Sequence, residues 1–261
     1  MAAEHDHDYY GNRPNAATPQ RRVVEAKPPA NRRRSTRYVP RMASLLRIDA
    51  SMDLAGSTTR RLTQAFTDAW VARFGDNSVV ERDLAQAPLP YLTDHNVHFA
   101  APLRPPGVVV DEADDQLVDE LIGELEAADA VVLGVPLYNY SIPATLKTWI
   151  DYVHIAGRTA GVPTLPFAGR PAILCTARGA SYASGEPSEG WDHASAALTV
   201  VLGDSMGMNV EAITTDLTLS ARFGMGAEVV AIAEAQLAAA LARAVELGAT
   251  LPLPVLNPCG R

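Results

Sequence analysis

The sequence contains few of the residues that mark several common classes of protein. Its two cysteines, Cys175 and Cys259, are too few for a disulfide framework, which fits a reducing cytoplasm. No apolar run approaches the roughly 20 residues that cross a bilayer, so we expect no association with a membrane. No His, Cys and carboxylate residues occur at metal-ligand spacing, so we expect no metal site.

Basic residues are scarce outside the N-terminal segment. Residues 1–42 hold nine of the 22 Lys and Arg residues and four of the 30 Asp and Glu residues, which leaves 13 basic and 26 acidic residues for the rest. This acidic body argues against nucleic acid as the principal partner. The cluster Arg32–Arg34 is not followed by the apolar segment of an export signal, so we expect a cytoplasmic protein.

Three regions differ in composition. Residues 1–41 are rich in Asn, Arg and Pro and lack apolar periodicity, which predicts a disordered basic extension. Met42 stands directly before the first predicted strand, so this extension is either a mis-assigned start or a lineage-specific addition. Residues 42–250 form the predicted domain. Residues 251–261 contain three prolines that cannot extend a helix, which predicts a loose tail.

Apolar runs and amphipathic stretches alternate strictly within the domain. Continuous apolar runs indicate strands that are buried on both faces, and a period of 3.6 indicates helices. The pattern predicts strands at 44–50, 78–82, 130–135, 171–177 and 209–214, and helices at 58–74, 114–127, 143–156, 193–206 and 227–248. Five such units predict an α/β fold with a doubly wound parallel sheet and helices on both faces. The long, Pro-rich connection 85–111 is typical of a site or an interface.

The first predicted strand ends in a loop of small and hydroxyl-bearing residues. Ser57, Thr58 and Thr59 fall at the start of the next helix, where free N–H groups and the helix dipole favour an anion. Gly56 allows a close backbone approach, and Ser51 at the strand end can complete a phosphate cradle. The alternative is that Ser57 is an ordinary N-cap and the threonines are incidental.

Other nucleotide-binding and signalling motifs are absent from these loops. Neither the G-x-G-x-x-G spacing of a dinucleotide site nor the G-x-x-x-x-G-K-S/T spacing of a P-loop is present. A response regulator needs an acceptor aspartate at the end of the third strand, where this sequence has Pro136.

The third and fourth predicted strands also end in loops suited to a ligand. Tyr138, Asn139 and Tyr140 present two aromatic rings and an amide, which can stack on and hydrogen-bond to a flat heterocycle. The alternative is a surface turn whose aromatic rings pack into the core. The segment 177–180 places glycine and small residues where backbone N–H groups can meet the edge of a ring.

Together the three loops resemble the FMN-dependent NADH-azoreductase family of flavodoxin-like quinone reductases, over residues 43–248. The most specific part is Pro-x-Tyr-Asn-(Phe/Tyr) at 136–140, followed by Leu-Lys-x-x-x-Asp at 146–151. The resemblance implies the strand order 2-1-3-4-5 and a bound FMN. It places the phosphate at Ser51, Ser57, Thr58 and Thr59, the isoalloxazine ring at Pro136, Leu137, Tyr138, Asn139 and Tyr140, and the pyrimidine edge at Ala177, Arg178, Gly179 and Ala180.

The resemblance also implies an activity. The flavin takes a hydride from NADH or NADPH and passes two electrons to a quinone or azo compound, so no catalytic side chain is expected and the kinetics should be ping-pong. It implies a homodimer with shared flavin pockets. Two departures, Thr159–Val162 and Asp204, lack aromatic residues that relatives place in the pocket. An electron carrier without a nicotinamide site and a tailoring reductase of secondary metabolism stay open.

Overall fold

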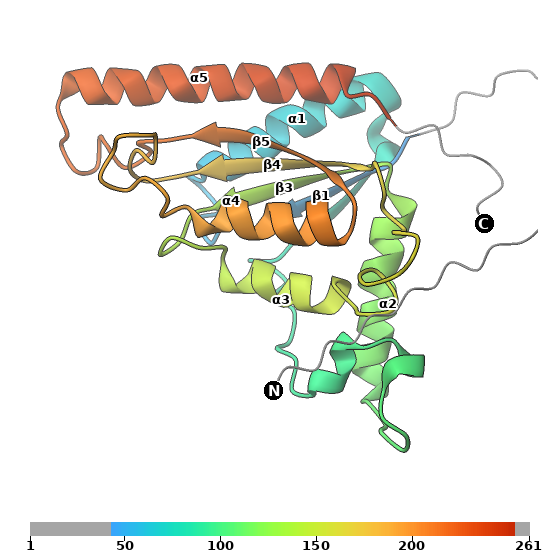
Figure 1. The fold of residues 1–261 in the computed structure, drawn as a ribbon. Helices are drawn as coiled ribbons and strands as arrows, with labels where there is room; N and C mark the ends of the chain where they lie inside the picture. Colours follow the sequence, from blue (N-terminus) through green and yellow to red (C-terminus); the bar gives the residue numbers. More distant parts are fainter. Residues whose placement is uncertain (1–42, 254–261) are drawn as a thin grey trace, which may run out of the picture. The chain divides into compact units, whose positions relative to one another are not determined.

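Five parallel strands form the centre of the fold (Figure 1). The protein is described by a computed structural model that covers residues 43–253. The sheet has the order β2-β1-β3-β4-β5. Its strands are β1 (Leu45–Asp49), β2 (Val79–Asp83), β3 (Ala130–Pro136), β4 (Pro171–Ala177) and β5 (Asn209–Thr215). The predicted fold class, strand order and strand positions are confirmed.

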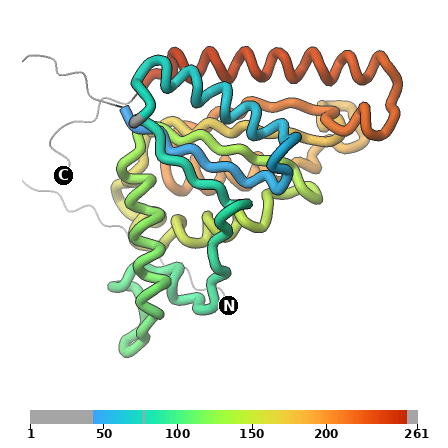
Figure 2. The backbone as a smooth tube through the Cα atoms, turned by 180° about the vertical axis from the view of Figure 1, so that it is seen from behind, coloured from blue at the N-terminus to red at the C-terminus, as the bar shows by residue number. Residues whose placement is uncertain are grey.

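Helices cover both faces of the sheet, as Figures 1 and 2 show from opposite sides. On one face lie α1 (Thr58–Phe74) and α5 (Ala227–Thr250); on the other lie α2 (Glu112–Ala127), α3 (Ala144–Val153) and α4 (His193–Leu198). The alternation of side chains along each strand supplies both cores. Leu45 faces Phe66 and Trp70 on the first face, while Leu46 and Ile48 face the second.

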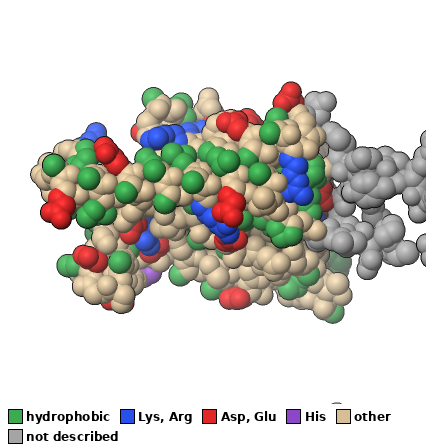
Figure 3. Space-filling model, turned by 90° about the horizontal axis from the view of Figure 1, so that it is seen from above, with side chains coloured by type: hydrophobic (Ala, Val, Ile, Leu, Met, Phe, Trp, Pro, Cys, Tyr) green, Lys and Arg blue, Asp and Glu red, His purple; other side chains and the backbone are tan. Residues whose placement is uncertain are grey.

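Helix α5 packs closely on α1 along one stripe. Its buried residues are Ala240, Ala244, Leu247 and Gly248. A Cβ atom added to Gly248 would lie 2.2 Å from the carbonyl oxygen of Phe66, so the two helices touch through backbone there. The opposite side of α5 mixes apolar and charged side chains (Figure 3). Its charged residues include Arg243, which pairs with Glu246 and with Glu211 of β5.

Strand β1 carries an ion pair that its apolar pattern does not predict. The Nε atom of Arg47 lies 2.9 Å from the carboxylate of Asp49, and both residues are buried. Thr63 of α1 donates a hydrogen bond to the same carboxylate. Burial raises the pKa of Asp49, and Arg47 opposes that shift. Gly134 of β3 leaves room for this group, because an added Cβ would lie 2.5 Å from an Asp49 oxygen.

The structure differs from the predicted elements in three places. The helix predicted at 193–206 is α4 followed by a π-helical segment, Thr199–Ser205, whose wider turn places Leu202 in the core. The connection 85–111 contains two short 3₁₀ turns, His95–His98 and Ala101–Leu103. Leu251 is buried beside Ala43, so packing extends past the predicted boundary at 250.

The predicted extension 1–41 and most of the predicted tail lie outside the described residues. From Ala43 to Leu253, no helix combines the length and the apolar character needed to span a bilayer.

Candidate functional site

The three predicted loops meet at one edge of the sheet, beyond the carboxyl ends of β1, β3 and β4. The hydroxyl of Tyr138 lies 3.3 Å from the Oγ atom of Ser51, which joins the first loop to the second. The backbone N–H of Leu137 donates to the carbonyl of Ala177, which joins the second loop to the third. This edge is where open α/β sheets bind ligands.

The start of α1 presents unpaired donors. Ser57 is the N-cap, and its Oγ atom accepts a hydrogen bond from the N–H of Arg60. The same oxygen lies 3.1 Å from the hydroxyl of Thr59, which is buried. The N–H groups of Thr58 and Thr59 form no hydrogen bond within the described residues. Ser57 is therefore an N-cap as the alternative held, and the anion-binding amides beside it stay available.

The loop before α1 is held closed by a carboxylate. Asp53 accepts hydrogen bonds from the N–H groups of Gly56 at 2.7 Å and Ala55 at 3.1 Å. These bonds lower the pKa of Asp53. The N–H of Gly56 is thus paired with Asp53 within the loop, and the expected close approach of an anion to the Gly56 backbone stays a prediction.

Arg60 connects the loop before α1 to the end of β2. Its guanidinium forms two hydrogen bonds to Asp83, at 2.6 and 2.8 Å, and two to the carbonyl of Ser51, at 2.8 and 3.3 Å. The arginine holds the pKa of Asp83 well below its usual range. Sequence reasoning missed this pair because Asp83 ends β2, 23 residues further along the chain. The pair fixes the ends of β1 and β2 and places a positive charge near the predicted phosphate site.

The second loop is a tight turn with unusual backbone angles. Asn139 and Tyr140 have φ values of 48° and 67°, in the left-handed region. Tyr138 and Ser141 exchange two hydrogen bonds of 3.0 Å across the turn. Such angles are uncommon for residues other than glycine and concentrate at functional sites. The Tyr140 side chain is exposed, so the alternative of aromatic rings packed into the core is wrong for this residue.

In the third loop, the side chain of Arg178 is paired within the protein. The guanidinium of Arg178 is bound by Asp216, at 2.5 and 2.9 Å, and by Asp192 at 3.0 Å. The backbone of Arg178 is paired as well, because its N–H donates to the carbonyl of Thr215 and its carbonyl accepts from Thr218. The predicted contact of Arg178 with a ligand stays a prediction. Both carboxylates lie far along the chain, so the sequence does not reveal them as its partners.

The N–H groups of Gly179 and Ala180 face no partner within the described residues, although the carbonyl oxygens of this segment are used. Those oxygens accept hydrogen bonds from Leu217, Thr218 and Leu219 of the loop after β5. The side chain of Leu219 packs against Gly179, because an added Cβ would lie 2.7 Å from its Cδ1 atom. The carbonyl oxygens of this loop are thus bound to the loop after β5, while the N–H groups of Gly179 and Ala180 remain available to a ligand.

A cavity of about 650 Å³ adjoins the second loop between α3 and the helical segment after β4. Its lining is mostly apolar, with Met52, Ile142, Ile150 and Val201 among its residues and Lys147 as its charged residue. Lys147 forms an ion pair with Asp151. This volume lies within the range of ligand pockets in proteins.

The two departures from the family pattern lie elsewhere. Thr159–Val162 follow the end of α3, and Asp204 closes the π-helical segment just before β5 begins. Both positions are at the amino edge of the sheet, opposite the three loops. Within one chain these residues therefore lie apart from the three loops, and their expected effect on the substrate pocket stays a prediction.

Two of the described histidines have structural roles. His154 ends α3 and its Nε2 atom lies 2.7 Å from the Oγ atom of Ser205, while His193 begins α4. No group of three or more His, Cys, Asp or Glu residues able to hold a metal occurs in the part of the chain that the structure describes.

Comparison with known proteins matches the flavodoxin-like fold family over residues 43–247. The chain belongs to this family. It is 45% identical over 210 residues to an FMN-dependent NADH:quinone oxidoreductase of Kineococcus radiotolerans, across 80% of this chain and all of that protein. A protein of the same name from Streptomyces avermitilis is 40% identical, across 76% and 92%. The crystal structure of an azoreductase from Bacillus anthracis strain Sterne superposes with a TM-score of 0.65 at 27% identity, across 80% and 99%.

Proposed function

We propose that this chain binds FMN, takes a hydride from NADH and reduces quinones or azo compounds by two electrons. The observation that carries the proposal is the convergence of three loops with unpaired donors at one edge of the sheet. The proposal is supported by two relatives named FMN-dependent NADH:quinone oxidoreductase and by a similar structure named azoreductase. We also propose a cytoplasmic location, which is supported by the small number of cysteines.

The residues fit an FMN in three parts. The free amides of Thr58 and Thr59, with the hydroxyls of Ser51, Ser57, Thr58 and Thr59, suit a terminal monophosphate. The turn 136–140 would lie against the flat ring, and the N–H groups of Gly179 and Ala180 would meet its polar edge. FMN supplies the hydride chemistry when it is bound, so the protein supplies binding, orientation and exclusion of water.

The visible absorbance of the bound flavin tests this proposal. Anaerobic NADH should bleach the FMN-loaded protein, and a quinone should restore the colour with release of the reduced quinone. Steady-state data should give parallel double-reciprocal lines, because NADH and the acceptor use the same space above the ring in turn. A flavin that NADH leaves oxidised would contradict the proposal and favour an electron carrier that lacks a nicotinamide site.

We further propose that the working unit is a homodimer in which each flavin pocket is completed by the partner chain. A ring bound at the carboxyl edge leaves one face open, and a second subunit is a common way to cover it. Met52, Leu54 and Val200 are large apolar residues that a lone chain exposes, with exposed fractions of 69%, 59% and 56%. These residues suit an interface beside the site.

Light scattering at several concentrations tests the dimer. We expect twice the chain mass of 27.8 kDa wherever the protein is active. A monomer with full activity would contradict the shared pocket and would leave the flavin assignment unaffected.

A further inference from the structure

Trp191 is an exposed aromatic residue next to the proposed ring site. The chain has three tryptophans, and Trp70 and Trp149 are fully buried, whereas 49% of the Trp191 surface is exposed. A large apolar side chain gains little from such a position in the folded chain alone. Its indole lies in the loop after β4, just before α4.

The indole forms a right-angled pair with Tyr140. The two ring centroids are 5.4 Å apart and the planes meet at 89°. Tyr140 belongs to the turn with left-handed backbone angles that we place against the isoalloxazine ring. The two rings therefore form an aromatic corner at the edge of the proposed flavin site.

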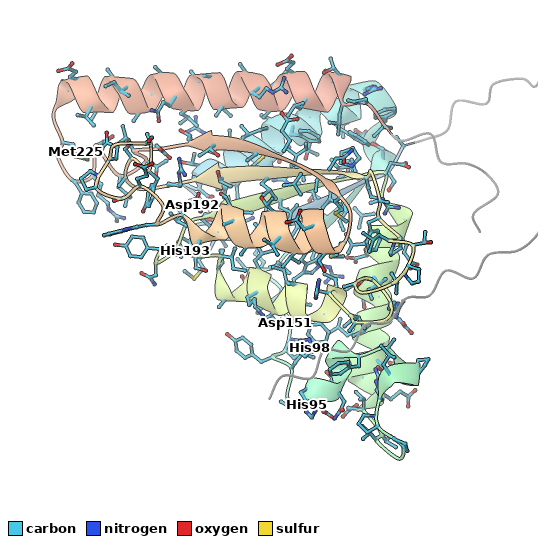
Figure 4. All side chains as sticks on the ribbon, viewed as in Figure 1. His95, His98, Asp151, Asp192, His193 and Met225 are labelled. Atoms are coloured by element: carbon cyan, nitrogen blue, oxygen red, sulfur yellow. The ribbon has the colours of Figure 1, made fainter. Side chains whose placement is uncertain are left out.

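The two residues that follow Trp191 are hydrogen-bonded to residues of the proposed site. The next residue, Asp192, accepts hydrogen bonds from Ser195 and from Arg178. The N–H of His193 donates to the carbonyl of Tyr140 at 3.0 Å. Asp192 and His193 lie together at the same edge of the sheet in Figure 4. These hydrogen bonds fix the position of Trp191 relative to Tyr140, so the pair of rings is formed before any ligand binds.

We propose that Trp191 determines specificity for planar aromatic acceptors. An acceptor that lies over the flavin would place the edge or face of its ring against the indole, because aromatic rings prefer such offset or perpendicular contacts. Trp191 thus favours aromatic quinones and azo arenes over acceptors without a ring. This inference rests on the proposed function and adds a residue that neither the sequence motif nor the FMN cradle contains.

The test compares Trp191→Leu with Trp191→Phe, which keeps a smaller aromatic face at the same position. With 2-methyl-1,4-naphthoquinone as the acceptor, we expect Trp191→Leu to raise KM about three- to tenfold, as loss of an aromatic pair predicts. Trp191→Phe should stay within about twofold of the native KM. The FMN dissociation constant should change less than twofold in both variants.

Fluorescence gives a second readout that needs no turnover. Because Trp191 is the only exposed tryptophan, the naphthoquinone should quench the emission of oxidised, FMN-loaded protein with a saturable curve. Trp191→Phe serves as the control for absorption by the quinone and should lose that saturable part.

The outcomes separate the two claims. Native protein that binds no FMN, or whose FMN is not bleached by NADH, would overturn the proposed function. If FMN binds and NADH bleaches it, equal KM values for Trp191→Leu and Trp191→Phe would overturn the role of Trp191 alone. A change in oligomeric state with no change in KM would also overturn it and would assign the indole to a subunit interface.

Discussion

Replacing Thr58 and Thr59 together by valine is expected to weaken FMN binding about a hundredfold or more. Valine keeps the shape of threonine and removes its hydroxyl, and each lost hydrogen bond to a charged group costs about 1.5 to 3 kcal/mol. The hydroxyl of Thr59 also pairs with the N-cap Ser57, so its loss loosens the cradle as well. Titration of the apoprotein, followed by quenching of flavin fluorescence, measures the dissociation constant.

Thr67→Val is the matched control on the same helix. Thr67 is buried and lies two turns further along α1, and its hydroxyl has no hydrogen-bond partner between Ala43 and Leu253. Its replacement should leave FMN affinity unchanged and should maintain or raise stability, since a buried unpaired hydroxyl is costly. Equal affinities for the double variant, Thr67→Val and the native protein would place the phosphate elsewhere.

Gly248→Ala should destabilise the fold, although alanine favours helices. The added Cβ would lie 2.2 Å from the Phe66 carbonyl oxygen and 3.0 Å from the Cβ atom of Ala69. Helices α1 and α5 would have to separate, and overpacking of this kind costs about 1 to 3 kcal/mol. Urea unfolding, monitored by circular dichroism, measures the change.

Gly123→Ala is the matched control, and we expect it to raise stability in the same urea experiment. Gly123 lies inside α2, and an added Cβ would have no atom within 4 Å. Without a clash, alanine should stabilise the helix by roughly 0.5 to 1 kcal/mol. A Gly248→Ala variant that is as stable as the native protein, or more stable, would show that the close contact of α1 with α5 does not limit the packing there.

The fold was predictable because its signals are local. Buried parallel strands such as β3 and β4 are continuous apolar runs, and the alternation of strands with helices decides the architecture. The π-helical segment was not predictable in this way, because its backbone register depends on how Leu198, Leu202 and Met206 fill the core. The buried pair Arg47–Asp49 likewise depends on space that Gly134 leaves in the neighbouring strand.

The sequence predicted which loops meet at the candidate site, but it did not predict which side chains hold those loops in place. Small residues at the start of α1 indicate an anion site from sequence alone, since helix termini have fixed chemistry. The roles of Asp53, Arg60 and Arg178 depend on hydrogen bonds within and between loops. Two of those three residues have partners more than 20 residues away, and no local pattern encodes such a distance. Trp191 was missed for the same reason, because its partner Tyr140 lies on another loop.

The cofactor itself gives the most direct test of the account. The purified protein, loaded with flavin and washed, should release one FMN per chain on heating, identified by its mass, because the cradle at Ser57–Thr59 suits a terminal monophosphate. Release of FAD, or a chain that stays colourless and fails to bind added FMN, would contradict the central claim.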